Sequence, residues 1–262
     1  MAPDASTLRD GLRHRLDALA AAGRTISLWW RDDDAALPEP ALNRLIALSD
    51  RLRLPLVLAV IPEPAQPSLA DRLAQPDAAH VTVVQHGWRH ANHEPAGARA
   101  AELGGARPVG TVMAELAEGH AKLTALFGAR FLPVLTPPWN RVDAEVARRR
   151  GEVGLPGLST FTSLERDRHR LDAHLDPIVW KTTRSYMGDE RMLMLFDEQT
   201  AARTGEAAEV PIGILSHHLS HDEPVWAFLE GFLAATADHP AVRWPSPPAL
   251  FGFDVPGRAG GV

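Results

Sequence analysis

The chain has 262 residues, of which 45% are hydrophobic and 23% are charged, an ordinary composition for a globular protein. Its 27 lysines and arginines against 33 aspartates and glutamates give a net charge of −6, which argues against general binding of nucleic acid or anionic lipid. Cysteine is absent, which excludes disulfides, thiolate metal sites and cysteine nucleophiles. No segment approaches the roughly 20 apolar residues of a membrane span, and residues 1–23 do not resemble a secretory signal. We therefore expect a cytoplasmic protein without membrane insertion.

Apolar, strand-like runs alternate with helical patterns along the chain. A leucine at every third or fourth position from Leu8 to Leu19 predicts an N-terminal helix within residues 1–24. Strands are expected at 26–30, 54–61, 81–85, 131–136, 158–161, 178–181, 211–215 and 242–244. Helices are expected at 39–53, 68–74, 111–127, 143–150 and 223–237. This alternation predicts an α/β fold, a distorted (β/α) barrel of about seven to eight mostly parallel strands that forms a single domain over residues 25–262.

Polar clusters follow four of the expected strands directly. They are Arg31 to Asp34, His86 to His93, Pro137 to Asn140, and Ser216 to Asp222. Six of the twelve histidines lie in the second and fourth of these clusters. Ligands of parallel α/β proteins bind at the carboxyl ends of the strands, where the loops converge. The sequence therefore predicts one polar pocket at that end of the barrel.

The spacing of His86 and His90 is typical of a metal site. Residues four apart on one helical turn aim both imidazoles at a common point, as in zinc enzymes. With an aspartate from a neighbouring strand end, they would form a two-histidine, one-carboxylate site that leaves one position open for water. The alternatives are a surface histidine pair and a non-haem iron site with the same ligands.

Two other clusters have both a functional and a structural interpretation. His217 and His218 follow an apolar run, so either could point into the barrel mouth or serve as a hydrogen-bonded structural histidine. Pro138, Trp139 and Asn140 could form a rigid turn. They could equally form the wall of a substrate groove, with Trp139 stacked on a sugar ring and nearby N–H groups facing a carbonyl.

The ordered set of motifs resembles the polysaccharide deacetylase family, carbohydrate esterase family 4, which has the chitooligosaccharide-deacetylase homology fold. The resemblance rests on an Asp-Asp pair, His-x-x-x-His, a proline-rich motif and Leu-x-His, and it spans roughly Ile26 to Leu233. It implies a metal-dependent hydrolase that removes an N-acetyl group from an amino sugar or related amide. It also implies one divalent cation, with Zn²⁺ as the first choice and Co²⁺, Ni²⁺, Mn²⁺ or Fe²⁺ as alternatives.

Carried onto this sequence, the resemblance makes Asp33 the general base and Asp34, His86 and His90 the metal ligands. The extra aspartate leaves a second register open, in which Asp32 is the base and Asp33 the ligand. Gly87 stands where the family usually has serine or threonine.

The remaining motifs depart further from the family. His217, in Leu-Ser-His, matches the general acid, and His218 stands where an aspartate commonly follows. Thr136 occupies the position of an arginine that orients the base, for which Arg31 or Arg141 could substitute. The faint fourth motif offers two groups that could support the acid, Asp176 and Trp180, and Asp222 is a second candidate carboxylate partner.

The expected partner is a small amino-sugar or glycan-like substrate. The missing export signal makes an extracellular polymer an awkward substrate, so a cytoplasmic amino-sugar derivative is preferred. The alternatives are an amidase for a non-sugar amide or ureide on the same barrel, and an inactive protein that binds metal or glycan. The oligomeric state is left open.

Overall fold

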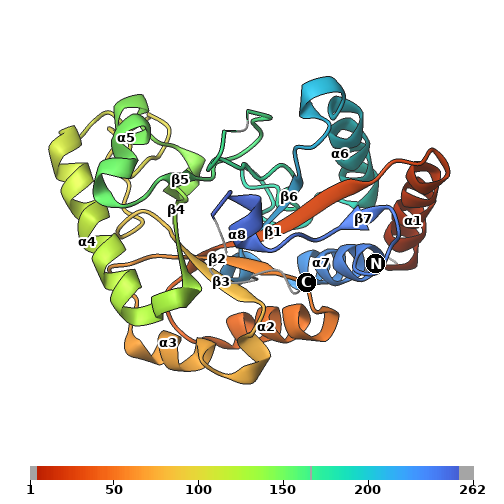
Figure 1. The fold of residues 1–262 in the computed structure, drawn as a ribbon, viewed down its shortest axis with the longest axis horizontal. Helices are drawn as coiled ribbons and strands as arrows, with labels where there is room; N and C mark the ends of the chain where they lie inside the picture. The colour runs from red at the N-terminus through yellow and green to blue at the C-terminus, as the bar shows by residue number, and fades with distance from the viewer. Residues whose placement is uncertain (1–4, 166, 254–262) are drawn as a thin grey trace, which may run out of the picture.

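The computed structural model describes residues 5–165 and 167–253 (Figure 1). The strands are β1 (Ile26–Ala35), β2 (Leu56–Val60), β3 (Val81–Gln85), β4 (Phe131–Leu135), β5 (Gly157–Leu158), β6 (Ile212–Ser216) and β7 (Val242–Arg243). The helices are α1 (Ala5–Ala21), α2 (Pro40–Leu52), α3 (Pro67–Leu73), α4 (Val109–Phe127), α5 (Ala144–Arg149), α6 (Asp189–Ala202), α7 (Glu223–Thr236) and α8 (Pro247–Leu250). Short 3₁₀ turns connect several of them.

The strands form one curved parallel sheet at the centre of the molecule, with helices around it (Figure 1). Their order is β5-β4-β3-β2-β1-β6, and β7 pairs with the start of β1. Every residue of β2 is buried, as expected for a strand covered on both faces. The predicted single-domain α/β fold is confirmed, as a half-barrel of six to seven strands.

An irregular segment, residues 170–175, joins the two edges of this sheet. On one side, the N–H of Leu171 donates to the carbonyl of Leu158 in β5 at 3.1 Å. On the other side, the N–H of Leu175 donates to Gly213 in β6 at 2.9 Å, and Leu215 donates back to Leu175 at 2.8 Å. No helix or strand was expected over residues 170–175, and the segment satisfies backbone groups that a sheet edge would leave exposed.

The structure corrects two expected elements and adds a helix. Strand β1 continues to Ala35, so the aspartate cluster forms the end of the strand and does not follow it. The expected strand at 178–181 is absent, because Ile178 makes one antiparallel bridge to Tyr186 and the chain then turns. Helix α6 was not predicted, since its core-facing side contributes only two fully buried apolar side chains, Met192 and Phe196.

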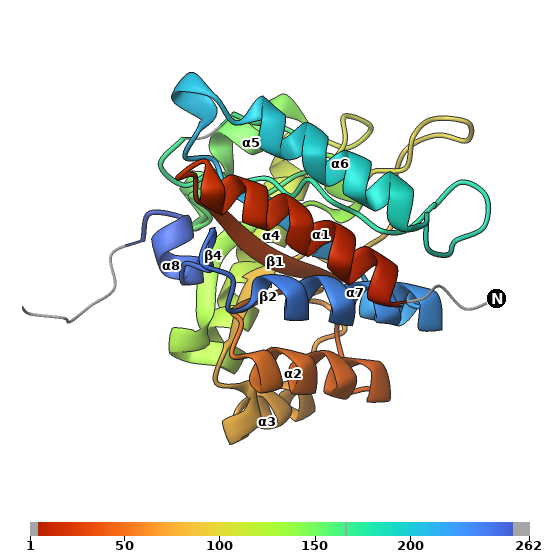
Figure 2. The same cartoon turned by 90° about the vertical axis from the view of Figure 1, so that its right-hand side faces the viewer.

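Helix α1 crosses the outside of β1, between α6 and α7 (Figure 2). The predicted leucine face is confirmed: Leu8, Leu12, Leu16 and Leu19 are buried in the main core. Within the described residues, no helix has the length and apolar character needed to cross a membrane.

Segment 170–175 packs so closely against β6 that there is no room for a side chain at Gly213. A Cβ there would lie 2.7 Å from the backbone of Ala173 and 2.5 Å from Nε1 of Trp29. Gly213→Ala is therefore expected to lower the free energy of unfolding by about 1–3 kcal/mol through overpacking. Urea unfolding measures this change.

The matched control is Gly231→Ala, within α7. A Cβ there meets its nearest neighbour, Cδ2 of Leu8, at an ordinary 3.8 Å. This variant should be neutral or stabilised by up to about 1 kcal/mol, because alanine favours a helix more than glycine does. Equal destabilisation in the two variants would contradict the close packing of segment 170–175 against Gly213.

Candidate metal centre and active site

The end of β1 sends its three consecutive carboxylates in different directions. The register between β1 and β2 shifts between Asp32 and Ala35, which marks a bulge. Asp34 has a φ of 74°, a left-handed backbone conformation that residues other than glycine seldom adopt. Asp32 and Asp33 are buried, whereas Asp34 is partly open to solvent. The three aspartates therefore occupy separate environments.

Asp34 lies against both predicted histidines. Its Oδ1 is 3.0 Å from Nε2 of His86 and 3.2 Å from Nε2 of His90, and one ligand atom from each residue lies within 4.8 Å of the others. The Nδ1 of His86 lies 2.9 Å from the carbonyl of Thr136, so Nδ1–H can donate there and leave the Nε2 lone pair for a cation. This donor set fits a divalent metal such as zinc.

The two histidines converge without the helical turn that their spacing suggested. Residues 86–90 are irregular in structure, and both Gly87 and His90 have a positive φ, of 59° and 57°. The predicted helical turn is therefore wrong, although the two imidazoles do meet, with ring centroids 5.3 Å apart.

The three groups of this site shift one another's pKa values. Burial alone would raise the pKa of the Asp34 carboxyl, but the hydrogen bond and charge of His86 outweigh it and hold the pKa well below its usual range. Burial and the neighbouring His86 lower the pKa of His90, which keeps its imidazole neutral. Burial opposes charge on His86, yet Asp33 and Asp34 raise its pKa overall. An anionic carboxylate and a neutral imidazole are the forms that bind metals.

Asp33 is held by a buried arginine from its own strand. Nε of Arg31 lies 2.9 Å from Oδ1 of Asp33, and a terminal nitrogen lies 3.1 Å from Oδ2. The same guanidinium donates to Asn140 at 2.5 Å and Ser159 at 2.7 Å. Arg141 donates instead to the carbonyl of Ala100. Of the two arginines considered from the sequence, Arg31 is therefore the one that contacts Asp33.

Asp32 is fully buried and directed toward the end of β6. Its Oδ1 contacts Nδ1 of His218, and its Oδ2 accepts from the backbone N–H of His218 at 3.1 Å and from Ser216 Oγ at 2.5 Å. Burial opposes charge on both partners, but their mutual attraction lowers the pKa of Asp32 and raises that of His218. This pair lies in the core, outside the Asp34 group.

His217 lies next to the Asp33 oxygen that Arg31 also contacts. Its Nε2 is 4.0 Å from Oδ2 of Asp33, and its backbone N–H donates to Nε2 of His221 at 3.1 Å. The ring edge of His217 packs on Trp180, with centroids 4.7 Å apart. His221 stays neutral, because burial lowers its pKa to about 4. His221 thus fixes the backbone of His217.

Neither candidate carboxylate partner of His217 forms a direct hydrogen bond to it in the described structure. Asp176 accepts from Nε1 of Trp180 at 2.7 Å and from the backbone of Ile178. Burial raises the pKa of Asp176, although the charge of His217 opposes that increase. Asp222 caps α7 through the N–H of Val225. Asp176 therefore reaches His217 through Trp180.

The proline-rich motif forms a tight 3₁₀ turn over residues 138–140. Trp139 and Asn140 both have a positive φ, of 54° and 56°, and consecutive non-glycine residues in this region indicate a strained backbone. The ring of Trp139 lies 4.3 Å from that of His90, and Pro138 is buried. The turn therefore borders the Asp34 group, and sugar stacking on Trp139 stays a prediction.

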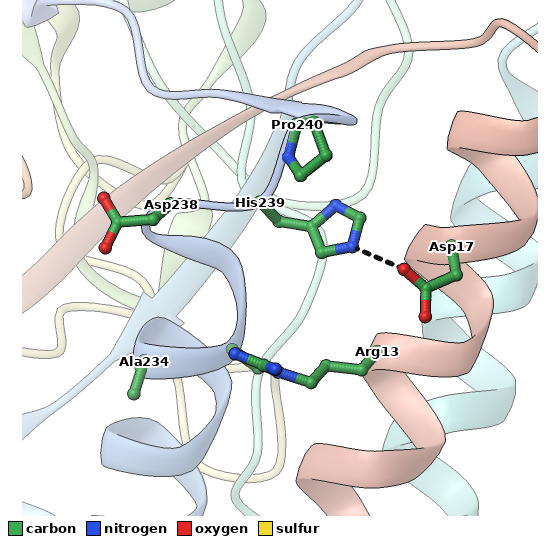
Figure 3. Close-up of a pocket in the computed structure, with 7 residues that line it drawn as sticks. Arg13, Asp17, Ala234, Asp238, His239 and Pro240 are labelled. Atoms are coloured by element: carbon green, nitrogen blue, oxygen red, sulfur yellow. Dashed lines mark hydrogen bonds and ion pairs between the residues drawn. The ribbon is translucent and has the colours of Figure 1, made fainter.

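A separate surface hollow of about 340 Å³ lies between α1 and α7 (Figure 3). His239 and Asp17 face it and pair with each other at 3.1 Å. This hollow is next to the start of β7, at the amino ends of the strands. The Asp34, His86 and His90 group lies at the opposite, carboxyl ends of the strands, where α/β proteins bind their ligands.

No protein-family model matches the chain, and no curated protein matches its sequence. Its fold is similar to that of a proposed polysaccharide deacetylase from Mycobacterium smegmatis, at 15% identity and a TM-score of 0.60, covering 87% of this chain and 89% of that one. Chitin deacetylase from Colletotrichum lindemuthianum is similar at 14% identity and a TM-score of 0.56, covering 88% and 89%. A family 4 carbohydrate esterase from Streptomyces lividans, in complex with acetate, has 14% identity and a TM-score of 0.51, covering 84% and 90%. The expected fold is therefore confirmed.

The geometry of the aspartates predicts different outcomes for their amide variants. Asp34→Asn and His90→Ala should abolish stoichiometric binding of one divalent ion, because each removes a ligand atom of the group. Asp33→Asn should retain the ion, since Asp33 faces Arg31. Elemental analysis after dialysis against Zn²⁺ measures occupancy. Loss of the ion in Asp33→Asn with retention in Asp34→Asn would show that Asp33, and not Asp34, is the metal ligand.

The Asp32–His218 pair predicts a pH-dependent stability. The pKa of His218 is raised in the folded state, so its contribution is complete below the unfolded value of about 6.5 and decreases as pH rises through the folded value. His218→Gln should cost about 3 kcal/mol near pH 6, because it leaves a buried carboxylate unpaired, and less near pH 9. Urea unfolding across this pH range measures the difference. The exposed His14→Gln is the control, and an equal cost of His218→Gln at both pH values would contradict the charged pair.

Proposed function

We propose that this protein is a metal-dependent hydrolase that removes an N-acetyl group from an amino sugar or a related amide. The observation that carries the proposal is the convergence of Asp34, His86 and His90 at the carboxyl end of the barrel. Two further titratable groups, Asp33 and His217, face each other beside them. A divalent ion held by the first three would supply the Lewis acidity that activates water and polarises an amide carbonyl.

Asp33 is the proposed general base. Arg31 contacts both oxygens of its carboxylate, and Oδ2 lies 4.0 Å from Nε2 of His217. A base held in this way can take the proton of the attacking water without first reorganising. Asp32 is unsuited to that role because its oxygens accept hydrogen bonds from Ser216 and His218 in the core.

His217 is the proposed general acid. An amine leaves a tetrahedral intermediate poorly unless its nitrogen is protonated, and an imidazolium close to that nitrogen can supply the proton. Nε2 of His217 is 4.0 Å from Oδ2 of Asp33, so the proposed acid and the proposed base lie close enough to act on one amide. Trp180 supports the orientation of His217, and Asp176 supports Trp180.

An amino-sugar substrate is supported by the pocket rim and by the neighbours in fold. Trp180, which is 37% exposed, and Trp139 offer aromatic faces of the kind that pack on sugar rings. Pro138 and Asn140 complete the proposed substrate wall next to Trp139. Two of the similar structures are named for deacetylation of chitin or polysaccharide, and a third is in complex with acetate. Together these observations favour an N-acetylated glycan as the substrate class.

The proposal is tested with two leaving groups of different basicity. For Zn²⁺-loaded His217→Ala, we expect acetate release from an N-acetylglucosamine oligosaccharide to fall by about 10²–10⁴-fold. Hydrolysis of an activated phenyl acetate should fall much less, because a phenolate leaves without a proton. Acetate release and phenol absorbance measure the two rates.

Asp33→Asn is the companion variant, and it should slow both substrates while it retains the metal. A set of small non-sugar amides and ureides assayed in parallel distinguishes a general amidase. Wild-type protein that binds the ion and an N-acetylated oligosaccharide yet releases no acetate from any substrate would contradict hydrolysis and leave a binding protein. If His217→Ala slowed the amide and the phenyl ester equally, the result would contradict the assignment of His217 as the general acid.

A further inference from the structure

The segment that carries the two histidines has no regular secondary structure to hold it. Between the end of β3 and His90 the chain is irregular, and Gly87 and His90 are both left-handed. The consecutive N–H groups of Trp88 and Arg89 lie beyond the end of β3, and a buried N–H requires a partner. The partner they have is a single side chain.

That side chain is Glu102, which is fully buried. Its Oε2 accepts from the N–H of Trp88 at 3.0 Å, and its Oε1 accepts from the N–H of Arg89 at 2.8 Å. Both carboxylate oxygens are therefore used on the loop between the two histidines. Charge-assisted bonds of this type are stronger than bonds between neutral groups.

Gly87 makes room for this carboxylate. A Cβ at position 87 would lie 2.0 Å from Oε2 of Glu102 and 2.6 Å from Cδ of Pro138. The chain next to Glu102 is fixed on both sides, because Ala101 accepts from the N–H of His93 at 3.0 Å and Leu103 accepts from that of Asp143 at 2.7 Å. The carboxylate is thus an anchored group against which the loop is packed.

We propose that Glu102 is a positioning residue of the metal centre, which sets the separation of His86 and His90 before a cation binds. This inference rests on the proposed metal site and adds a group that touches neither the cation nor the substrate. Groups that orient metal ligands in this way typically contribute 10–100-fold to metal affinity.

The test is Glu102→Gln, which keeps the size of the side chain but offers one acceptor oxygen where the carboxylate has two. We expect Zn²⁺ affinity, measured by chelator competition, to fall by about 10–100-fold. In the metal-free protein, the amides of Trp88 and Arg89 should exchange with deuterium faster than in wild type.

The matched control is Glu94→Gln, which removes the same charge from the same loop. Glu94 bonds to the N–H of Ala106 at 3.3 Å and leaves the histidine segment untouched, so its affinity and exchange should match wild type. Wild-type zinc affinity in Glu102→Gln, or an equal loss in Glu94→Gln, would overturn the proposal.

Two further outcomes keep the test decisive. If Glu102→Gln does not fold, Glu102→Asp replaces it, because a shorter carboxylate cannot reach both amides, and wild-type affinity in that variant overturns the proposal. If the wild type binds no Zn²⁺, the proposed function fails. The deuterium exchange of the Trp88 and Arg89 amides in Glu102→Gln then tests separately whether Glu102 holds the loop. Exchange at the wild-type rate would overturn the positioning role of Glu102.

Discussion

Three adjacent carboxylates at the end of one strand are the constraint on which the pocket depends. Like charges this close repel one another, and Asp32 and Asp33 are buried, so each requires its own cationic partner. The bulge and the left-handed Asp34 separate the three side chains. Each then pairs with a different part of the chain: Asp32 with the end of β6, Asp33 with β1 itself, and Asp34 with the end of β3.

The buried guanidinium of Arg31 connects the proposed base to the loops on the far side of the pocket. It bonds to Asp33, to Asn140 after β4 and to Ser159 after β5. A buried ion pair adds little net stability because desolvation offsets the attraction, although removal of one partner is costly. Arg31 therefore contributes chiefly geometry, since it holds the Asp33 carboxylate relative to two loops that come from distant parts of the sequence.

Elements with a strong local burial pattern could be predicted from the sequence, and those held by backbone bonding could not. β3 lies at Val81–Gln85, as expected, because three of its five residues are buried valines, a residue type that favours strands. The segment 170–175 was not predicted: Leu171, Ala173 and Leu175 alternate with polar residues, but the run is short, and what joins it to β5 and β6 is long-range main-chain bonding. The same is true of Glu102, whose place in a loop rich in alanine and glycine gives no sign of its contacts with Trp88 and Arg89.

Residue order alone was sufficient to predict that an aspartate after β1 and the two histidines after β3 come together, since parallel strands bring their carboxyl ends to the same end of a sheet. The environments of Asp32, Asp33 and Asp34 were decided only in three dimensions. They depend on one left-handed residue and on partners as distant as His218, which is 186 positions from Asp32. Likewise, the spacing of His86 and His90 indicated a shared target but the wrong backbone. The direction of a side chain at a strand end is set by local dihedral angles and long-range contacts, and neither is encoded in hydrophobic periodicity.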